Sequence, residues 1–127
     1  MYDMKDQINT LLSGISEAHV SYIHAQQMTS LPVITFCEYN NCEVERQGGK
    51  EYLSKIVIQI DLYESSGDHL SSLAATVNNL IYTTGLRRSY TRETYDSQTN
   101  LFHKSMLFKG IIQPDTGVVY QNYKEEK

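Results

Sequence analysis

The chain contains no tryptophan, two prolines and two cysteines among its 127 residues. Cys37 and Cys42 are too few for the disulfide framework of a small secreted domain, so we expect free thiols in a reducing compartment. No stretch approaches the roughly 18 apolar residues that would span a membrane. The N-terminal MYDMKDQINTLL lacks the basic and then apolar layout of a secretory signal. We therefore expect a soluble protein that folds in the cytoplasm.

The sequence also lacks the common catalytic and nucleotide-binding motifs. It has no GxSxG, HExxH, GxGxxG or Walker-type loop, and its four histidines lie in separate segments, away from any nucleophile motif. The spacing of Cys37 and Cys42 would suit two zinc ligands, but a structural zinc site needs four, and no second pair follows. We expect no enzymatic activity, no metal and no cofactor. A site assembled from residues distant in the sequence stays open.

The net charge and the tyrosine content bear on which kinds of partner the protein could bind. The net charge is −4 with no long run of one sign, which argues against strong nonspecific binding to nucleic acid or to anionic lipid. Tyrosine is abundant, with 10 residues against 3 phenylalanines. Tyrosine has an apolar ring and a polar tip, so it suits either a half-exposed sheet face or a protein interface. Both interpretations stay open.

The first half of the chain predicts a helix followed by strands. Apolar residues recur at helical spacing from Met4 to Ile15. Two short β-type segments follow at 20–25 and 31–39, with Pro32 confined to the start or edge of the second because proline donates no ladder hydrogen bond. Residues 40–51 mix charges with Asn-Asn and Gly-Gly pairs, which predicts an exposed, mobile connection.

The second half predicts a strand, a helix and a hairpin. Residues 53–63 alternate apolar and mostly polar side chains, as in a strand with one buried face. A turn at 65–68 supplies a helix N-cap, and apolar residues then share one helical face from Leu70 to Ile81, before Gly85 closes the helix. Segments from Arg87 and at 101–112, joined by a turn at 96–100, predict a hairpin. We expect the tail, 113–127, to be loose apart from a short strand at 118–120.

Together these elements predict one α+β domain over residues 1–127. Runs of antiparallel strands with interspersed helices favour a mostly antiparallel β-sheet with two amphipathic helices packed on one face, and not a βαβ fold. A chain of this length is the usual size of one domain.

A local basic and aromatic cluster is the strongest candidate for a binding surface. Arg87, Arg88 and Arg92 interleave with Tyr90, and strand alternation would place Arg88, Tyr90 and Arg92 on one face. Such a face could be exposed to solvent, contact a protein partner or bind nucleic acid, and all three interpretations stay open. Arg46, in the segment 40–51, joins these residues as a candidate interface residue because that segment is charged and has no core periodicity.

The layout resembles the tail terminator, or tail completion, proteins of long-tailed bacteriophages. The resemblance rests on INTLLSGI, LPVITFCEY with its Pro32, YLSKIVIQIDLYES, HLSSLAATVNNLIYTTG and FHKSMLFKGII, which cover most of the chain. It implies an α+β structural protein of the virion tail, without catalytic activity, assembled in the host cytoplasm.

The resemblance further implies partners. Family members are thought to form rings, usually hexamers, that cap the tail tube, stop its polymerisation and present the surface joined by the head. The implied partners are other copies of the chain, the tail-tube protein and a head-completion or connector protein, with no membrane and no specific nucleic-acid binding. Another neck-completion protein, a small nucleic-acid-binding module and a small enzyme with a dispersed site stay as alternatives.

Overall fold

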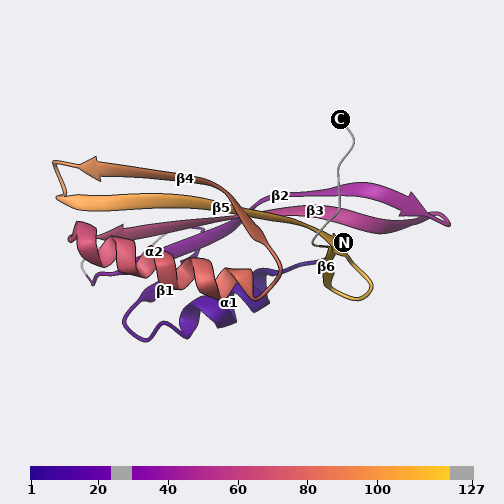
Figure 1. The fold of residues 1–127 in the computed structure, drawn as a ribbon, viewed down its shortest axis with the longest axis horizontal. Helices are drawn as coiled ribbons and strands as arrows, with labels where there is room; N and C mark the ends of the chain where they lie inside the picture. The colour runs from indigo at the N-terminus through magenta and orange to yellow at the C-terminus, as the bar shows by residue number, and fades with distance from the viewer. Residues whose placement is uncertain (24–29, 121–127) are drawn as a thin grey trace.

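The computed structural model describes residues 1–23 and 30–120, which form an α+β fold around a six-stranded sheet (Figure 1). Its strands run in the order β1-β2-β3-β5-β4, and β6 pairs with β5. β1 and β2 are parallel, and the other pairs in the sheet are antiparallel. The predicted α+β class with a mostly antiparallel sheet is therefore confirmed. The elements are α1 (Lys5–Ser13), β1 (His19–Tyr22), β2 (Val33–Gln47), β3 (Lys50–Glu64), α2 (Gly67–Tyr82), β4 (Arg87–Asp96), β5 (Leu101–Gln113) and β6 (Val118–Tyr120).

Strand β3 forms the centre of the sheet, between β2 and β5. Its even-numbered residues from Ile56 to Leu62 are almost completely buried, whereas Gln59 and Asp61 point to the opposite face and stay partly exposed. This is the alternation that the sequence predicts for 53–63, and it arises because successive side chains of a strand point to opposite faces. β3 therefore divides the molecule into a core side and a second, more polar side.

Helix α2 begins where the sequence places a cap. The Ser66 side chain accepts a hydrogen bond from the backbone N–H of His69 at 3.3 Å, which satisfies one of the unpaired donors of the first turn. The helix ends at Tyr82, and Gly85 follows with φ +94°, a conformation that glycine adopts without steric cost.

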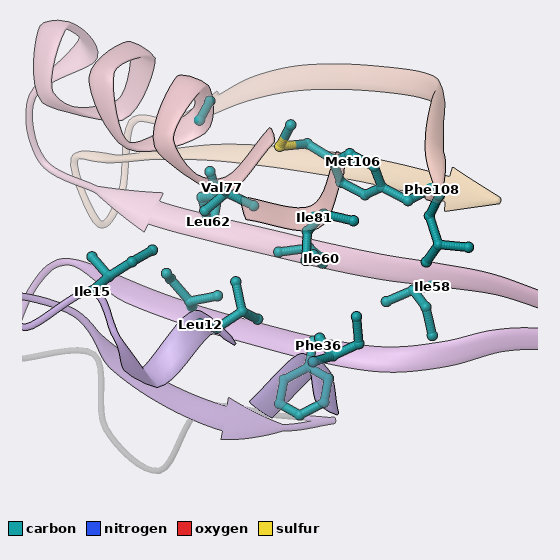
Figure 2. Packing of buried hydrophobic residues seen from close by; sticks show 14 of the residues in the cluster. Leu12, Ile15, Phe36, Ile58, Ile60, Leu62, Val77, Ile81, Met106 and Phe108 are labelled. Carbon is teal, nitrogen blue, oxygen red and sulfur yellow. The ribbon is translucent and has the colours of Figure 1, made fainter. Parts of the chain in front are cut away.

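Both helices contribute to one hydrophobic core, and Figure 1 shows them on the same side of the sheet. In Figure 2, Leu12 of α1 and Val77 and Ile81 of α2 lie among side chains from β3 such as Ile60 and Leu62. The most completely buried large side chains of the described residues are Phe108, Met4, Ile8, Leu12, Ile34, Ile56, Ile60, Leu62, Leu70, Ile81, Leu86 and Met106.

The prediction of a mobile connection at 40–51 is wrong. β2 and β3 are 15 residues each and form one long hairpin, closed by the two-residue turn Gly48-Gly49, in which φ is +60° and +77°. Positive φ at both central residues belongs to the turn type whose twist matches paired strands. We call residues 44–53 the β2–β3 arm, because β3 makes its last pair with β5 at Ser54. The outer part of β2 in this arm is polar because it extends past the core, so no buried face imposes alternation there, whereas Leu53 at the base of the arm is buried.

The structure also refines the predictions for the strand at 20–25 and for the C-terminal tail. The strand predicted at 20–25 is β1, which ends at Tyr22; positions 24 and 25 lie outside the described residues. Within the tail predicted to be loose, residues 113–117 form a turn and β6 pairs with β5, so the expected short strand at 118–120 is present and this part is ordered against the sheet. Residues 121–127 lie outside the described residues.

Within residues 1–23 and 30–120, no helix combines the length and the apolar character needed to cross a bilayer.

Candidate assembly surface

Strand β4 is the most exposed element of the sheet. All ten of its residues are exposed, and it pairs on one side only, with β5. No other strand of the described residues pairs with its outer edge. An edge strand presents unpaired backbone N–H and C=O groups that can pair with another chain, and natural proteins often protect such edges with charged side chains and bulges. β4 has both features.

The bulge overturns one prediction from the sequence. The register between β4 and β5 shifts between Arg88 and Tyr90, so that Arg88 lies opposite Phe108 and Tyr90 opposite Leu107. Consecutive residues of β5 point to opposite faces, so Arg88 points to the helix side while Tyr90 and Arg92 point to the other face. The predicted common face for Arg88, Tyr90 and Arg92 is wrong, because the extra residue Ser89 reverses the alternation.

Two of the three arginines of β4 are already engaged within the molecule. Nη1 of Arg88 donates a hydrogen bond to Oδ1 of Asn78 on α2 at 3.1 Å, and the guanidinium of Arg87 lies 4.8 Å from the centre of the Tyr82 ring. Arg92 makes no hydrogen bond or ion pair with the described part of the chain, whereas the neighbouring Glu93 forms an ion pair with Lys104 at 3.3 Å. Arg92 is therefore the arginine of β4 that is most available to a partner.

Arg46 lies at the tip of the β2–β3 arm. Its Nη1 donates to the backbone carbonyl of Gly49 at 2.6 Å, and its Nε forms an ion pair with Glu43 at 3.1 Å. These contacts brace the turn. The arm and the β4–β5 turn lie at opposite ends of the sheet (Figure 1), so the structure does not bring Arg46 together with the arginines of β4.

A shallow groove of about 310 Å³ lies between α2 and the helix side of β4. Small side chains of α2, including Ser71 and Ala75, line one wall, and Arg88 and Lys104 lie on the sheet side. Arg88 and Lys104 are bound to Asn78 and Glu93, so their positive charges are partly satisfied inside the molecule. The groove is a consequence of the small residues on α2, and it contains no histidine or carboxylate that could act on a substrate.

The face of the sheet opposite the helices carries a polar cluster that the sequence analysis missed. Nε2 of His103 lies 2.8 Å from Oδ1 of Asp61, and Gln59 donates to Oδ2 of Asp61 at 2.9 Å. The rings of Tyr63 and His103 stack with centres 4.5 Å apart and an interplanar angle of 9°. Asp61 and His103 are 42 positions apart on strands that are not consecutive in the chain, so only the register of β3 with β5 reveals the cluster.

The electrostatics of this cluster favour an ionised carboxylate. Burial is the largest single influence and raises the pKa of Asp61, but hydrogen bonds with His103, Ser105 and Gln59 together outweigh it, so the pKa lies below its ordinary value. The cluster has an Asp–His pair, yet among the described residues no serine, threonine or cysteine hydrogen-bonds to His103. A nucleophile activated by this histidine is therefore not assembled in the described part of the chain.

The two thiols are free, and their environments differ. Cys42 is exposed on β2, whereas Cys37 is half-buried beside Gln59, where burial and then the negative charge of Asp61 raise its thiol pKa. Within residues 1–23 and 30–120, no three or more histidine, cysteine or acidic side chains are grouped so that they could hold a metal ion.

No protein-family model matches the sequence, and no curated protein matches it.

Proposed function

We propose that the protein is a structural subunit of a bacteriophage tail that caps the tail tube as a ring, stops its polymerisation and presents the surface joined by the head. The resemblance of the sequence to tail terminator and tail completion proteins motivates the proposal. In this proposal the two amphipathic helices form one layer on a single face of the sheet. The opposite face, the edge of β4 and the β2–β3 arm are then left for neighbouring subunits.

One observation supports the proposal above the others: in the described part of the chain, the sheet has long exposed stretches that another subunit could cover. The ten residues of β4 are all exposed, and the β2–β3 arm continues past the last pair between β3 and β5. Residues 46–50 at the tip of the arm are exposed, and a two-stranded hairpin without further packing is only marginally stable in water. A contact between two different surfaces of identical subunits closes into a ring when the rotation allows it, and here the arm and the β4 edge are two such surfaces.

The size of the contact decides whether the ring is stable alone. Specific interfaces that persist without help bury about 1,000 Å² or more in total. If each contact is smaller, the protein is monomeric in solution and assembles only on the end of a tube, which positions several subunits side by side. Either behaviour is consistent with a terminator.

Mass measurement tests the proposal. We would determine the mass of the purified protein by light scattering over a concentration series, alone and with the tail-tube protein of the same phage. The expected result is a closed ring of defined mass, or a monomer that binds tube ends and halts their growth. A monomer at every concentration that leaves tube growth unchanged would contradict the proposal.

The same experiment separates the main alternative, a neck protein that binds the head connector. Such a protein would leave tube length unchanged but bind purified connector rings. Binding to duplex DNA that weakens steeply as salt is raised would instead indicate a nucleic-acid-binding module.

A further inference from the structure

We propose that neighbouring subunits join edge to edge, with the outer edge of β4 in one subunit paired to the outer edge of the β2–β3 arm in the next. This inference rests on the ring assembly proposed above and specifies its contact. β4 has no strand beyond it among the described residues, and β1 pairs with β2 only from Val33 to Phe36. Among the described residues, no strand pairs with the outer side of β2 beyond Phe36, so this part of β2 is a second edge, at the other side of the sheet and towards its other end.

Strand direction and side-chain orientation suit this pairing. Three successive antiparallel steps, from β2 to β3 to β5 to β4, make β2 and β4 antiparallel within one subunit. A rotation that continues the sheet preserves strand directions, so the β2 of the next subunit arrives antiparallel to β4, the better-bonded arrangement.

A specific pair of charges then lies on a common face. Arg92 lies opposite Ser105, which lies opposite Asp61, so Arg92 points to the face without helices. Glu45 lies opposite Leu53, which shares the alternation of Asp61 along β3 and therefore the same face. Arg92 of one subunit can thus meet Glu45 of the next across the new strand pair.

The two edges also carry opposite charge. β4 contains three arginines and two acids, Glu93 and Asp96, whereas β2 from Cys37 to Gln47 contains three glutamates and a single arginine. Opposite charges facing each other across an antiparallel pair are stabilising, and like charges are destabilising. The excess of arginine on β4 and of glutamate on the outer part of β2 therefore favours contact between these two edges.

The register implies a tilted ring. Leu53, level with Glu45, and Asp61, level with Arg92, are eight residues apart along β3, which is about 26 Å at roughly 3.3 Å per residue. The four strands from β2 through β3 and β5 to β4 span about 19 Å at roughly 4.8 Å each. The strands would therefore lean at roughly 54° to the ring axis, which is steeper than the roughly 35–45° typical of closed barrels.

A charge swap tests the contact. Arg92→Glu and Glu45→Arg are each expected to weaken association by about tenfold per contact, since each places like charges opposite each other. The double variant restores the pair and is expected to assemble like the wild type. Lys50→Glu is the matched control, because it reverses an exposed charge of the arm on β3, away from the outer edge of β2. Far-UV circular dichroism would verify that each variant is folded.

Disulfide trapping keeps the proposal testable if a charge variant fails to fold. With Cys37→Ser, Cys42 is the one remaining thiol. Because the bulge at Val44 leaves Cys42 and Glu45 on the same face, the antiparallel register brings Cys42 near Thr94 of the next subunit, whose side chain points to that face. We would place cysteine in turn at Thr94, Tyr95 and Asp96, oxidise at high protein concentration, and look for covalent multimers. Cysteine at the exposed Ser72 of α2 is the control.

The outcomes distinguish a failure of the proposed edge contact from a failure of the proposed ring. Rescue by the double variant, or multimers from the β4 cysteines and not from the control, would support the edge contact. A ring that forms normally without rescue and without trapping would overturn the edge contact and leave the ring proposal standing. Absence of any wild-type assembly, alone or on tubes, together with no trapping, would overturn both.

Discussion

Asp61 and His103 are joined across β3 and β5 by a hydrogen bond of 2.8 Å on the face of the sheet without helices. The Asp61 side chain is only 13% exposed, and its other oxygen accepts from Gln59, so the carboxylate is well supplied with donors. The stacked Tyr63 ring fixes the orientation of the imidazole. This cluster gives the polar face a defined structure where exposed strands would otherwise hold independent side chains.

Asp61 is expected to make stability depend on pH in the acid range. Its pKa in the folded protein is below the ordinary value of about 3.9, so the fold favours the ionised form. That contribution is complete above the unfolded pKa and is lost as the pH falls through the folded pKa. In Asp61→Asn, we expect the free energy of unfolding to fall by about 1 kcal/mol at pH 7. It should also fall less steeply than the wild type between about pH 4 and pH 2.

Urea unfolding at a series of pH values measures this difference. Asp115→Asn is a suitable control because Asp115 lies in an exposed turn. If Asp61→Asn and the wild type lose stability in parallel on acidification, the hydrogen bonds to the carboxylate do not stabilise the fold.

The Gly48-Gly49 turn is expected to tolerate asparagine and resist β-branched residues. A side chain at position 48 would meet no atom within 4 Å, so any cost comes from the backbone conformation with φ +60°. Gly48→Val should lower the free energy of unfolding by roughly 1–2 kcal/mol, the cost of a left-handed conformation in an ordinary residue. Gly48→Asn should be nearly neutral, since Asn-Gly is a preferred pair in this turn. Thermal unfolding of both variants provides the comparison; equal melting temperatures would show that the turn relaxes.

The two thiols should react at different rates. Cys42 is exposed, whereas Cys37 is half-buried and has a raised pKa, so less of its reactive thiolate is present at neutral pH. Maleimide labelling followed by mass spectrometry should modify Cys42 first. In Asp61→Asn, labelling of Cys37 should accelerate, because the negative charge that raises its thiol pKa is gone. Faster labelling of Cys37 than of Cys42 in the wild type would contradict this account.

Truncation of Leu12 should reveal how much α1 contributes to the core. Leu12 is completely buried, and its replacement by alanine leaves a cavity, with an expected loss of about 2–5 kcal/mol in the free energy of unfolding. Thr10→Ala, on the exposed side of the same helix, should change stability by less than about 0.5 kcal/mol. Chemical denaturation of the two variants gives the comparison, and a loss below about 1 kcal/mol for Leu12→Ala would indicate that α1 packs loosely.

Elements with a buried face could be predicted from the sequence, because burial of one face makes apolar residues recur at regular spacing along the chain. β3 shows alternation, α2 shows helical spacing with a Ser66 cap, and β4 with β5 shows two strand segments around a turn. The outer half of β2 has no such period, since it extends past the core. One local signal was nevertheless present, because two glycines between strand-compatible segments are typical of a tight hairpin.

Features that depend on register could not be predicted. The bulge at Ser89 adds one residue to β4, and no local property of the sequence RRSYTRETY marks that position. As a result, the sequence grouped Arg88 with Arg92, although their side chains lie on opposite faces. The contact of Asp61 with His103 has the same origin, because it requires knowing that β3 pairs with β5 across the intervening helix and β4.

The length of β3 has a mechanical consequence. This single strand runs from the Gly48-Gly49 turn through the hydrophobic centre to Glu64, and its inner part is hydrogen-bonded to β2 on one side and β5 on the other. A pull on the arm along the strand axis therefore loads many hydrogen bonds in shear at the same time, instead of breaking them one after another. Tension applied at the tip is thus carried directly into the hydrophobic core, as the proposed role at the junction of tail and head would require.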